Sequence, residues 1–132
     1  MSAPRRLRPE GLVRSSAFSH VAIVPPGATT IYVGGQNAVD SSGALIGDGD
    51  VAAQSVRALQ NVATALAAAG ASLRDVVQWT VLFVDGVDIA AGYAAIAGDL
   101  ATDEPGLITA ARVAGLGVPG ALVEISAVAA VV

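Results

Sequence analysis

The sequence contains no cysteine, no lysine among its seven basic residues, and a single histidine, His20. Without cysteine the chain forms no disulfide and offers no thiol nucleophile or thiolate metal ligand. Without lysine it forms no Schiff base with a carbonyl substrate. One histidine and scattered carboxylates make a poor ligand set for a metal ion. We therefore expect no metal site and no cofactor.

Charged residues are also scarce. They make up 14% of the chain, against about 25% in ordinary soluble domains, while 54% of the residues are hydrophobic. The net charge is −4, and four of the seven arginines lie within the first 14 residues, so the remaining body is more acidic still. This charge argues against a nucleic-acid partner. So little charge indicates either an alanine-rich compositional bias or a surface largely buried between subunits, and the two are compatible.

Neither end of the sequence reads as a membrane segment. Pro9, Glu10 and Gly11 interrupt any apolar run after the N-terminal arginines, so no signal-peptide core follows them. The apolar run at the C-terminus is too short for a membrane-spanning helix. With the absence of cysteine, these features favour a cytoplasmic protein without a membrane partner.

Hydrophobic periodicity predicts one α+β domain over residues 1–132, in the order β-β-α-β-α-β-β. Residues 1–17 are expected to form a largely irregular N-terminal arm, and the first two strands a hairpin across the Pro- and Gly-rich turn 25–30. Asp50 is a good N-cap for the first helix and Gly70 a good stop. The expected strands cover residues 18–24, 31–36, 76–84, 107–113 and 119–132, and the helices cover 51–69 and 89–100.

The last strand carries one carboxylate, Glu124, within a run of small and β-branched residues. Strand-helix-strand crossovers are right-handed, so both helices should cover the same face of the sheet. The other face would hold Glu124 together with Leu82, Leu122 and Val128, which is too apolar to face water. Other copies of the chain could bury this face, so the pattern predicts a closed homo-oligomer.

An ionised carboxylate in an apolar strand costs several kcal/mol or more unless it has donors or a partner. Glu124 is therefore a candidate general acid or base that can also hold a water, or it pairs across a subunit interface. Other candidates are weaker. His20 lies in an expected strand without a G-x-S-x-G elbow, which favours a structural role. Gly34 and Gly35 lack the spacing of a dinucleotide site.

Four stretches resemble the RidA/YjgF family of reactive-intermediate deaminases. They are RLRPEGL with FSHVAIV, IYVGGQ ending at Gln36, the helix-turn-strand segment from Ala53 to Asp88, and GALVEISAVA around Glu124. The resemblance runs from about residue 6 to the end. It implies a chorismate-mutase-like fold, a homotrimer, and small-molecule clefts between subunits. It also implies hydrolysis of enamine or imine intermediates to 2-oxo acids and ammonia.

The resemblance also implies a set of site residues. Glu124, the expected catalytic residue, is retained, as are the ligand-binding Gly34, Gly35 and Gln36. Other positions depart from the family pattern. The family's aromatic hydroxyl is replaced by Phe18, its helix-two Asn by Tyr93, its substrate-anchoring Arg by Leu107, and its small polar or thiol residue by Thr109.

The missing Arg bears directly on the substrate. A guanidinium pairs with a carboxylate through two parallel hydrogen bonds, and Leu107 removes that anchor. Arg112 has the opposite strand parity and should leave the sheet on the other face. We therefore expect a C–N bond hydrolase for a less anionic ligand rather than a standard 2-imino-acid deaminase. A non-catalytic ligand-binding or protein-interaction trimer is the alternative. Ordinary deaminase activity would require Arg112 or an N-terminal arginine from a neighbouring chain.

Overall fold

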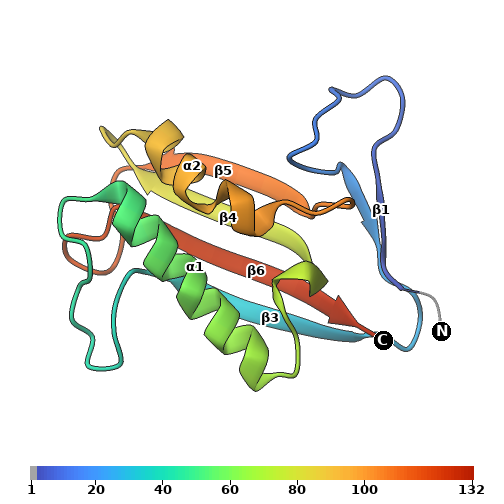
Figure 1. The fold of residues 1–132 in the computed structure, drawn as a ribbon, viewed down its shortest axis with the longest axis horizontal. Helices are drawn as coiled ribbons and strands as arrows, with labels where there is room; N and C mark the ends of the chain where they lie inside the picture. Colours follow the sequence, from blue (N-terminus) through green and yellow to red (C-terminus); the bar gives the residue numbers. More distant parts are fainter. Residues whose placement is uncertain (1–2) are drawn as a thin grey trace.

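The structure is a computed structural model, and it describes residues 3–132. Within these residues, two helices, a short 3₁₀ turn and six strands follow one another (Figure 1). They are β1 (Arg5–Leu7), β2 (Val21–Ile23), β3 (Thr29–Gln36), α1 (Val51–Ala68), η1 (Leu73–Asp75), β4 (Val76–Val84), α2 (Ile89–Leu100), β5 (Leu107–Val113) and β6 (Val123–Val131).

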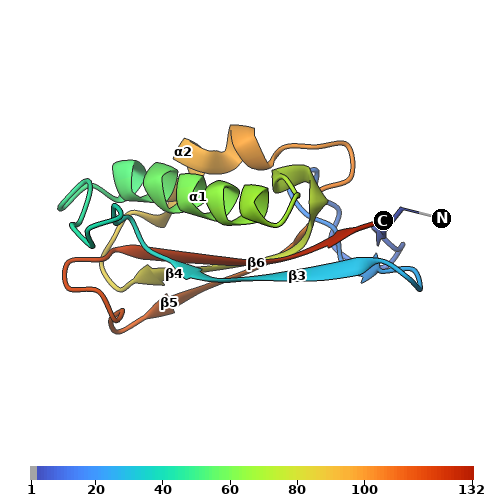
Figure 2. The ribbon, with the colours of Figure 1, turned by 90° about the horizontal axis from the view of Figure 1, so that it is seen from below.

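Four of the strands form a mixed sheet in the order β3-β6-β4-β5. β6 is antiparallel to both of its neighbours, while β4 and β5 are parallel and joined through α2. Both helices lie on one face of this sheet, and among the described residues no helix covers the opposite face (Figure 2). The predicted α+β class and the order of the long elements are confirmed. We call the uncovered side the open face.

The predicted pairing of the first two strands is wrong. β2 pairs with β1 in a separate two-stranded sheet, with Arg6 opposite Ala22, and this arm lies beside one end of the main sheet (Figure 1). The segment between β2 and β3 contains Pro25 and Pro26. Proline has no N–H to give to a strand ladder and fixes its own backbone angle. The chain therefore turns away instead of forming a hairpin.

The helices begin and end where their capping residues predict. Asp50 caps α1 by accepting a hydrogen bond from the backbone N–H of Ala53 at 3.0 Å, and Asp88 caps α2 through Ala91 at 3.1 Å. Gly70 follows α1 with a φ of +76°, the left-handed conformation that ends many helices. No helix within residues 3–132 is long and apolar enough to cross a membrane.

The core lies between the helices and the sheet, and the predicted two-face pattern of β6 is confirmed. Its alternate residues from Val123 to Ala129 are buried in the core, while Glu124 and Ser126 are half-buried on the open face. On β4, strict alternation from Gln78 would place Val76 on the open face, but Val76 belongs to the core cluster. The register with β6 shifts between Val76 and Gln78, and a bulge of this kind reverses the alternation.

Candidate functional site

Glu124 is the second residue of β6 and lies on the open face, opposite Leu82 of β4. Its carboxyl group lies over the backbone of β3. A Cβ placed on Gly35 would be 2.6 Å from both Cδ and Oε2 of Glu124, far inside van der Waals contact. The absence of a side chain at Gly35 therefore creates the space that the carboxylate occupies.

The register of β3 against β6 shifts between Val33 and Gln36. The Gly34–Gly35 pair lies within this irregular stretch, and both glycines are exposed. The Gln36 side chain folds back to donate a hydrogen bond from Nε2 to the Gly34 carbonyl at 3.1 Å. Bulges re-aim backbone and side chains and are common beside active sites. The structure thus gathers four of the predicted residues, Gly34, Gly35, Gln36 and Glu124, which we call the glutamate cluster.

Two buried amide side chains hold the backbone segments next to this cluster, and sequence reasoning missed them. Asn37, 8% exposed, donates from Nδ2 to the Val123 carbonyl at 3.0 Å. Gln54 of α1 is fully buried and joins two loops, since it donates to the carbonyls of Gly47 and Gly120 and accepts from the N–H of Leu122 at 2.8 Å. The sequence could have marked Gln54, because helical spacing places this polar residue on the buried face of α1. Asn37 follows a strand and gives no such signal.

A second group of predicted residues lies at the start of β5. The N–H of Ser19 donates to the Gly106 carbonyl at 3.2 Å, which joins the residue after Phe18 to the residue before Leu107. The Phe18 ring lies edge-on to His20 with centroids 5.4 Å apart, and His20 Nε2 is 2.7 Å from the Val13 carbonyl. Phe18, Leu107 and Thr109 form what we call the leucine cluster.

The two clusters lie at opposite ends of the open face. Leu107 is in register with Gln78, and Gln78 with Val128 of β6. Glu124 is four residues from Val128, or roughly 13 Å along the strand. β4 also separates β6 from β5, which adds about 10 Å across the sheet. One chain therefore does not bring Leu107 to Glu124.

Tyr93 and Arg112 lie on the helix side of the sheet. Tyr93 packs against the core cluster from α2, so one chain does not bring it to Glu124. The register of β5 with β4 is continuous from Leu107 to Val113, and Arg112 is opposite the buried Phe83. The Arg112 guanidinium donates to the Val87 carbonyl at 3.4 Å. As its parity predicts, it leaves the sheet on the face away from Leu107.

Two hollows bear on where a ligand could bind. The first, of about 290 Å³, lies on the open face and is lined by β3, β4 and β6 residues that include Tyr32, Gly34, Thr80 and Ser126. It adjoins the glutamate cluster at Gly34 and extends toward Val128, the residue in register with the leucine-cluster end. Its lining combines the hydroxyl groups of Tyr32, Thr80 and Ser126 with apolar side chains.

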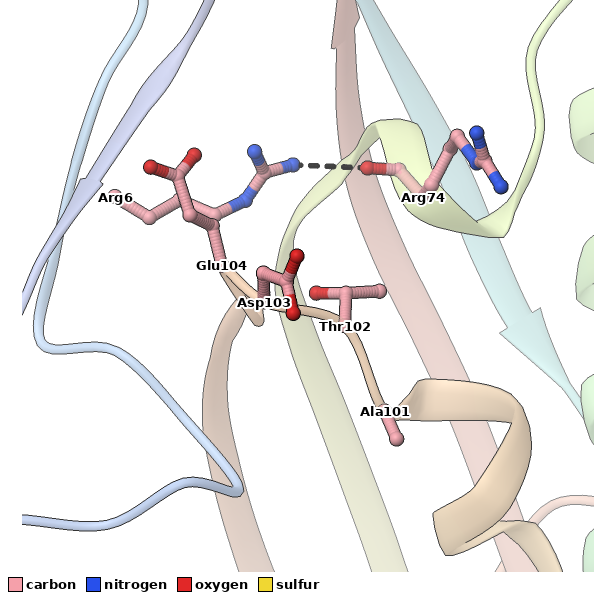
Figure 3. A pocket seen from close by; sticks show the side chains of 6 residues that line it. All are labelled: Arg6, Arg74, Ala101, Thr102, Asp103 and Glu104. Atoms are coloured by element: carbon pink, nitrogen blue, oxygen red, sulfur yellow. Dashed lines mark hydrogen bonds between the residues drawn. The ribbon is translucent and has the colours of Figure 1, made fainter.

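The second hollow, of about 690 Å³, separates the N-terminal arm from the body (Figure 3). Arg6 reaches across it and donates from Nη2 to the carbonyls of Arg74 at 3.1 Å and Val76 at 2.8 Å. The side chains of Asp103 and Glu104 line the same hollow. It contains none of the predicted site residues. Within residues 3–132, no three His, Asp or Glu side chains gather to hold a metal ion, and the expectation of no cofactor stays a prediction.

Two helices on one face of a mixed sheet, with the other face uncovered, define a chorismate-mutase-like fold. Residues 12–131 match the family model described as Endoribonuclease L-PSP. The Rid-family protein YyfB from Yersinia pestis is 30% identical, with a TM-score of 0.86 over 98% of this chain and 100% of that one. The chain belongs to the RidA/YjgF family.

Other solved structures are similar over most of their length. The YjgF gene product of E. coli is 32% identical with a TM-score of 0.68, and the match covers 80% of this chain and 83% of that one. RidA from the Antarctic bacterium Psychrobacter sp. PAMC 21119 is 27% identical with a TM-score of 0.70, over 96% and 94%. A search of curated proteins finds no match.

Proposed function

We propose that this RidA-like chain assembles as a homotrimer and binds a small molecule in pockets between subunits. The observation that carries the proposal is the separation of the glutamate and leucine clusters on the open face. A neighbouring copy packed against that face would bring the Phe18 and Leu107 end of one chain to the Glu124 end of the next. The open face carries Leu82, Leu107 and Val128 beside its polar groups, and among residues 3–132 no helix covers it (Figure 2). Both features support such packing.

Within that pocket, Glu124 would act as an acid and base in the hydrolysis of an enamine or imine. An enamine takes a proton on carbon to become an iminium ion, and water then adds to the C=N bond. Loss of a proton from the added water and protonation of nitrogen allow the C–N bond to break. The products are a carbonyl compound and ammonia. The Glu124 carboxylate lies over the Gly35 backbone, and the neighbouring glycines of β3 are exposed, so water can reach it. It can therefore hold the attacking water and transfer these protons.

The proposed substrate carries less negative charge than a 2-imino acid. Leu107 stands where the family resemblance implies a carboxylate-binding Arg, and it is half-buried at the start of β5. The nearest arginine in the strand, Arg112, donates to the Val87 carbonyl on the other side of the sheet. Phe18 adds a second apolar group to this end of the pocket. An apolar substituent on the substrate, rather than a carboxylate, suits these two side chains.

Turnover of a panel of neutral and anionic enamines, imines and related amides tests the proposal, with ammonia release measured against the uncatalysed rate. We expect neutral members to react faster than 2-imino acids, and Glu124→Gln to lower the rate by about 10²-fold or more. Gln60→Glu, a change at an exposed position on α1, is a control. Saturable binding without turnover would instead favour the non-catalytic ligand-binding trimer. Rapid hydrolysis of 2-imino acids would contradict the role given to Leu107.

The proposal includes a cytoplasmic location and no nucleic-acid partner. A net charge of −4 disfavours the phosphate backbone. Two of the N-terminal arginines also bind backbone carbonyls of the chain itself, Arg6 at Arg74 and Val76 and Arg8 at Asp103. The absence of cysteine suits a reducing compartment.

A further inference from the structure

We propose that Asn37 is a positioning residue for Glu124. It sets the position of the Glu124 carboxylate by fixing the bulged end of β3 to the Val123 carbonyl. This inference rests on the proposed role of Glu124 and assigns a task to a residue outside the predicted site. It starts from the contact between Glu124 and Gly35. Because the carboxylate fills the space of a missing side chain at 2.6 Å from the Cβ position, the position of the Gly35 backbone sets the position of the carboxylate.

The strand ladder does not hold that backbone in place by itself. The register of β3 with β6 shifts between Val33 and Gln36, and the last paired residues are Gln36 and Ile125. A bulge leaves one residue without its ladder bond and lets the strand bend. Gly34 and Gly35 add backbone freedom at that point. The end of β3 therefore needs another attachment if Glu124 is to keep one position.

The Asn37 side chain supplies this attachment. Its Nδ2 donates at 3.0 Å to the carbonyl of Val123, the residue directly before Glu124. The residue is 8% exposed, and a hydrogen bond shielded from water in this way is costly to break. The bond joins Asn37, one residue beyond the last paired residue of β3, to Val123, two residues before its β6 partner Ile125. It therefore holds Gly35 close to Glu124 at the end of β3 that the ladder leaves unpaired.

Asn37 is itself held from the helix layer. Asn61 of α1 donates from Nδ2 to the carbonyls of Asn37 and Val39, both at 2.9 Å. Arg57, one turn earlier, donates from Nε to Asn61 Oδ1 at 3.2 Å and so orients the amide. The path from α1 through Asn61 and Asn37 to Val123 is continuous, and it ends beside the proposed acid and base.

The experiment uses the chain labelled with ¹³C at the glutamate carboxyl groups. The sequence has three glutamates, Glu10, Glu104 and Glu124, and Glu124→Gln identifies the Glu124 signal. Asn37→Leu keeps the approximate shape of the side chain and removes its donor. Gly35→Ala, which must displace the carboxylate, is the positive reference. Leu66→Val, at the far end of α1, is the control for a general loss of stability.

We expect Asn37→Leu to move and broaden the Glu124 signal in the direction produced by Gly35→Ala, while Leu66→Val leaves it unchanged. On any substrate that the protein turns over, kcat should fall about 10-fold or more with little change in KM, because the acid and base is displaced rather than the ligand. An unchanged Glu124 signal in folded Asn37→Leu would overturn the proposal.

Should Asn37→Leu fail to fold, Asn61→Ala gives the same comparison with Asn37 still in place. An altered Glu124 signal there supports the proposal, and an unaltered one overturns it. The nuclear magnetic resonance comparison needs no substrate. If no compound is turned over by the wild-type protein, the proposed function fails, while the carboxyl signals still decide the role of Asn37.

Discussion

At the scale of single residues, Glu124 depends on a residue that has no side chain. Gly35 is a glycine without a positive φ, so backbone conformation does not require it. Close approach does, since the Glu124 carboxyl lies where its Cβ would be. A glycine that is needed only because it leaves space for a neighbouring side chain gives no signal in hydrophobic periodicity. Its resemblance to a family motif, and not its spacing, is what marked it in the sequence.

Leu107→Arg tests the substrate class at one position. The new guanidinium would start from the open face at the beginning of β5, in register with Gln78. We expect it to lower KM for 2-imino acids by about 10-fold or more, since charge-assisted hydrogen bonds contribute about 1.5–3 kcal/mol. KM for neutral imines should rise or stay constant. Steady-state kinetics on a matched pair, a 2-imino acid and its amide, measures the difference, and Leu107→Met is the uncharged control.

Asp40 predicts how the stability of the protein depends on pH. The Ser42 hydroxyl donates to its Oδ1 at 2.7 Å, and with the backbone N–H groups of Ala44 and Ser42 it holds the pKa of Asp40 below its ordinary value of 3.8. A lowered pKa in the folded state stabilises the protein above pH 3.8, and this stability is lost as the pH falls through the lower, folded value.

Asp40→Asn should therefore lower Tm at pH 6, and the difference from wild type should shrink below about pH 3.8. Thermal unfolding followed by circular dichroism between pH 2 and 7 measures it. Asp85→Asn, an exposed aspartate in the turn before α2, is the control. A difference between Asp40→Asn and wild type that grows on acidification would show that the hydrogen bonds do not favour the charged carboxylate.

At the scale of elements, the sequence predicted what depends on local periodicity and capping. The bounds of α1 follow from Asp50 and Gly70 and those of α2 from its apolar spacing, and the buried faces of β4 and β6 follow from alternation. The errors come from interactions that are distant in the sequence. β2 pairs with β1 across an irregular segment; Pro25 and Pro26 count against a hairpin with β3, but no local pattern identifies β1 as the partner. The bulge at Val77 was also hidden, since every residue around it is a good strand former.

The packing of α2 supplies a matched pair of glycines. A Cβ on Gly92 would lie 2.8 Å from Cε1 of the buried Phe83 and 3.1 Å from Ser55 Oγ, while a Cβ on Gly98 meets nothing within 4 Å. Gly92→Ala should lower the free energy of unfolding by about 1–2 kcal/mol, because overpacking outweighs the gain in helix propensity. Gly98→Ala should raise it by about 0.5–1 kcal/mol.

Urea unfolding of both variants measures the two free energies under the same conditions. The pair shares one helix and one chemical change, so propensity alone would stabilise both variants equally. Stabilisation by Gly92→Ala would mean that α2 can move away from β4 at little cost. The close approach of helix and sheet behind the open face would then be looser than the contact with Phe83 indicates.

At the scale of the whole molecule, the predicted site residues lie far apart in one chain. The resemblance named Phe18, Leu107 and Glu124 together, and the directions of the strands explain why one chain separates Leu107 from Glu124. β5 is parallel to β4, and β6 is antiparallel to it, so the start of β5 lies at the end of the sheet where β6 finishes. Tyr93 lies on the other side of the sheet because α2 belongs to the helix layer. Neither arrangement could be predicted without the pairing of the strands.

The assembly through the open face can be tested directly with Val128→Glu. Val128 is half-buried on β6, one of the two central strands, and lies opposite Tyr32, whose side chain is 79% exposed in the single chain. A monomer would keep the new carboxylate partly hydrated, whereas a trimer would bury it without a partner at a cost of several kcal/mol. We expect wild type near three times 13.0 kDa, about 39 kDa, and Val128→Glu near the mass of one chain.

Light scattering coupled to size exclusion measures these masses, and circular dichroism verifies that the variant is folded. Gln60→Glu adds the same charge on α1, on the opposite side of the sheet, and should leave the mass unchanged. A Val128→Glu protein that keeps the wild-type mass would place the interface elsewhere. The ends of the open face would then not meet between subunits, and the pocket that combines Glu124 with Leu107 would have no means of forming.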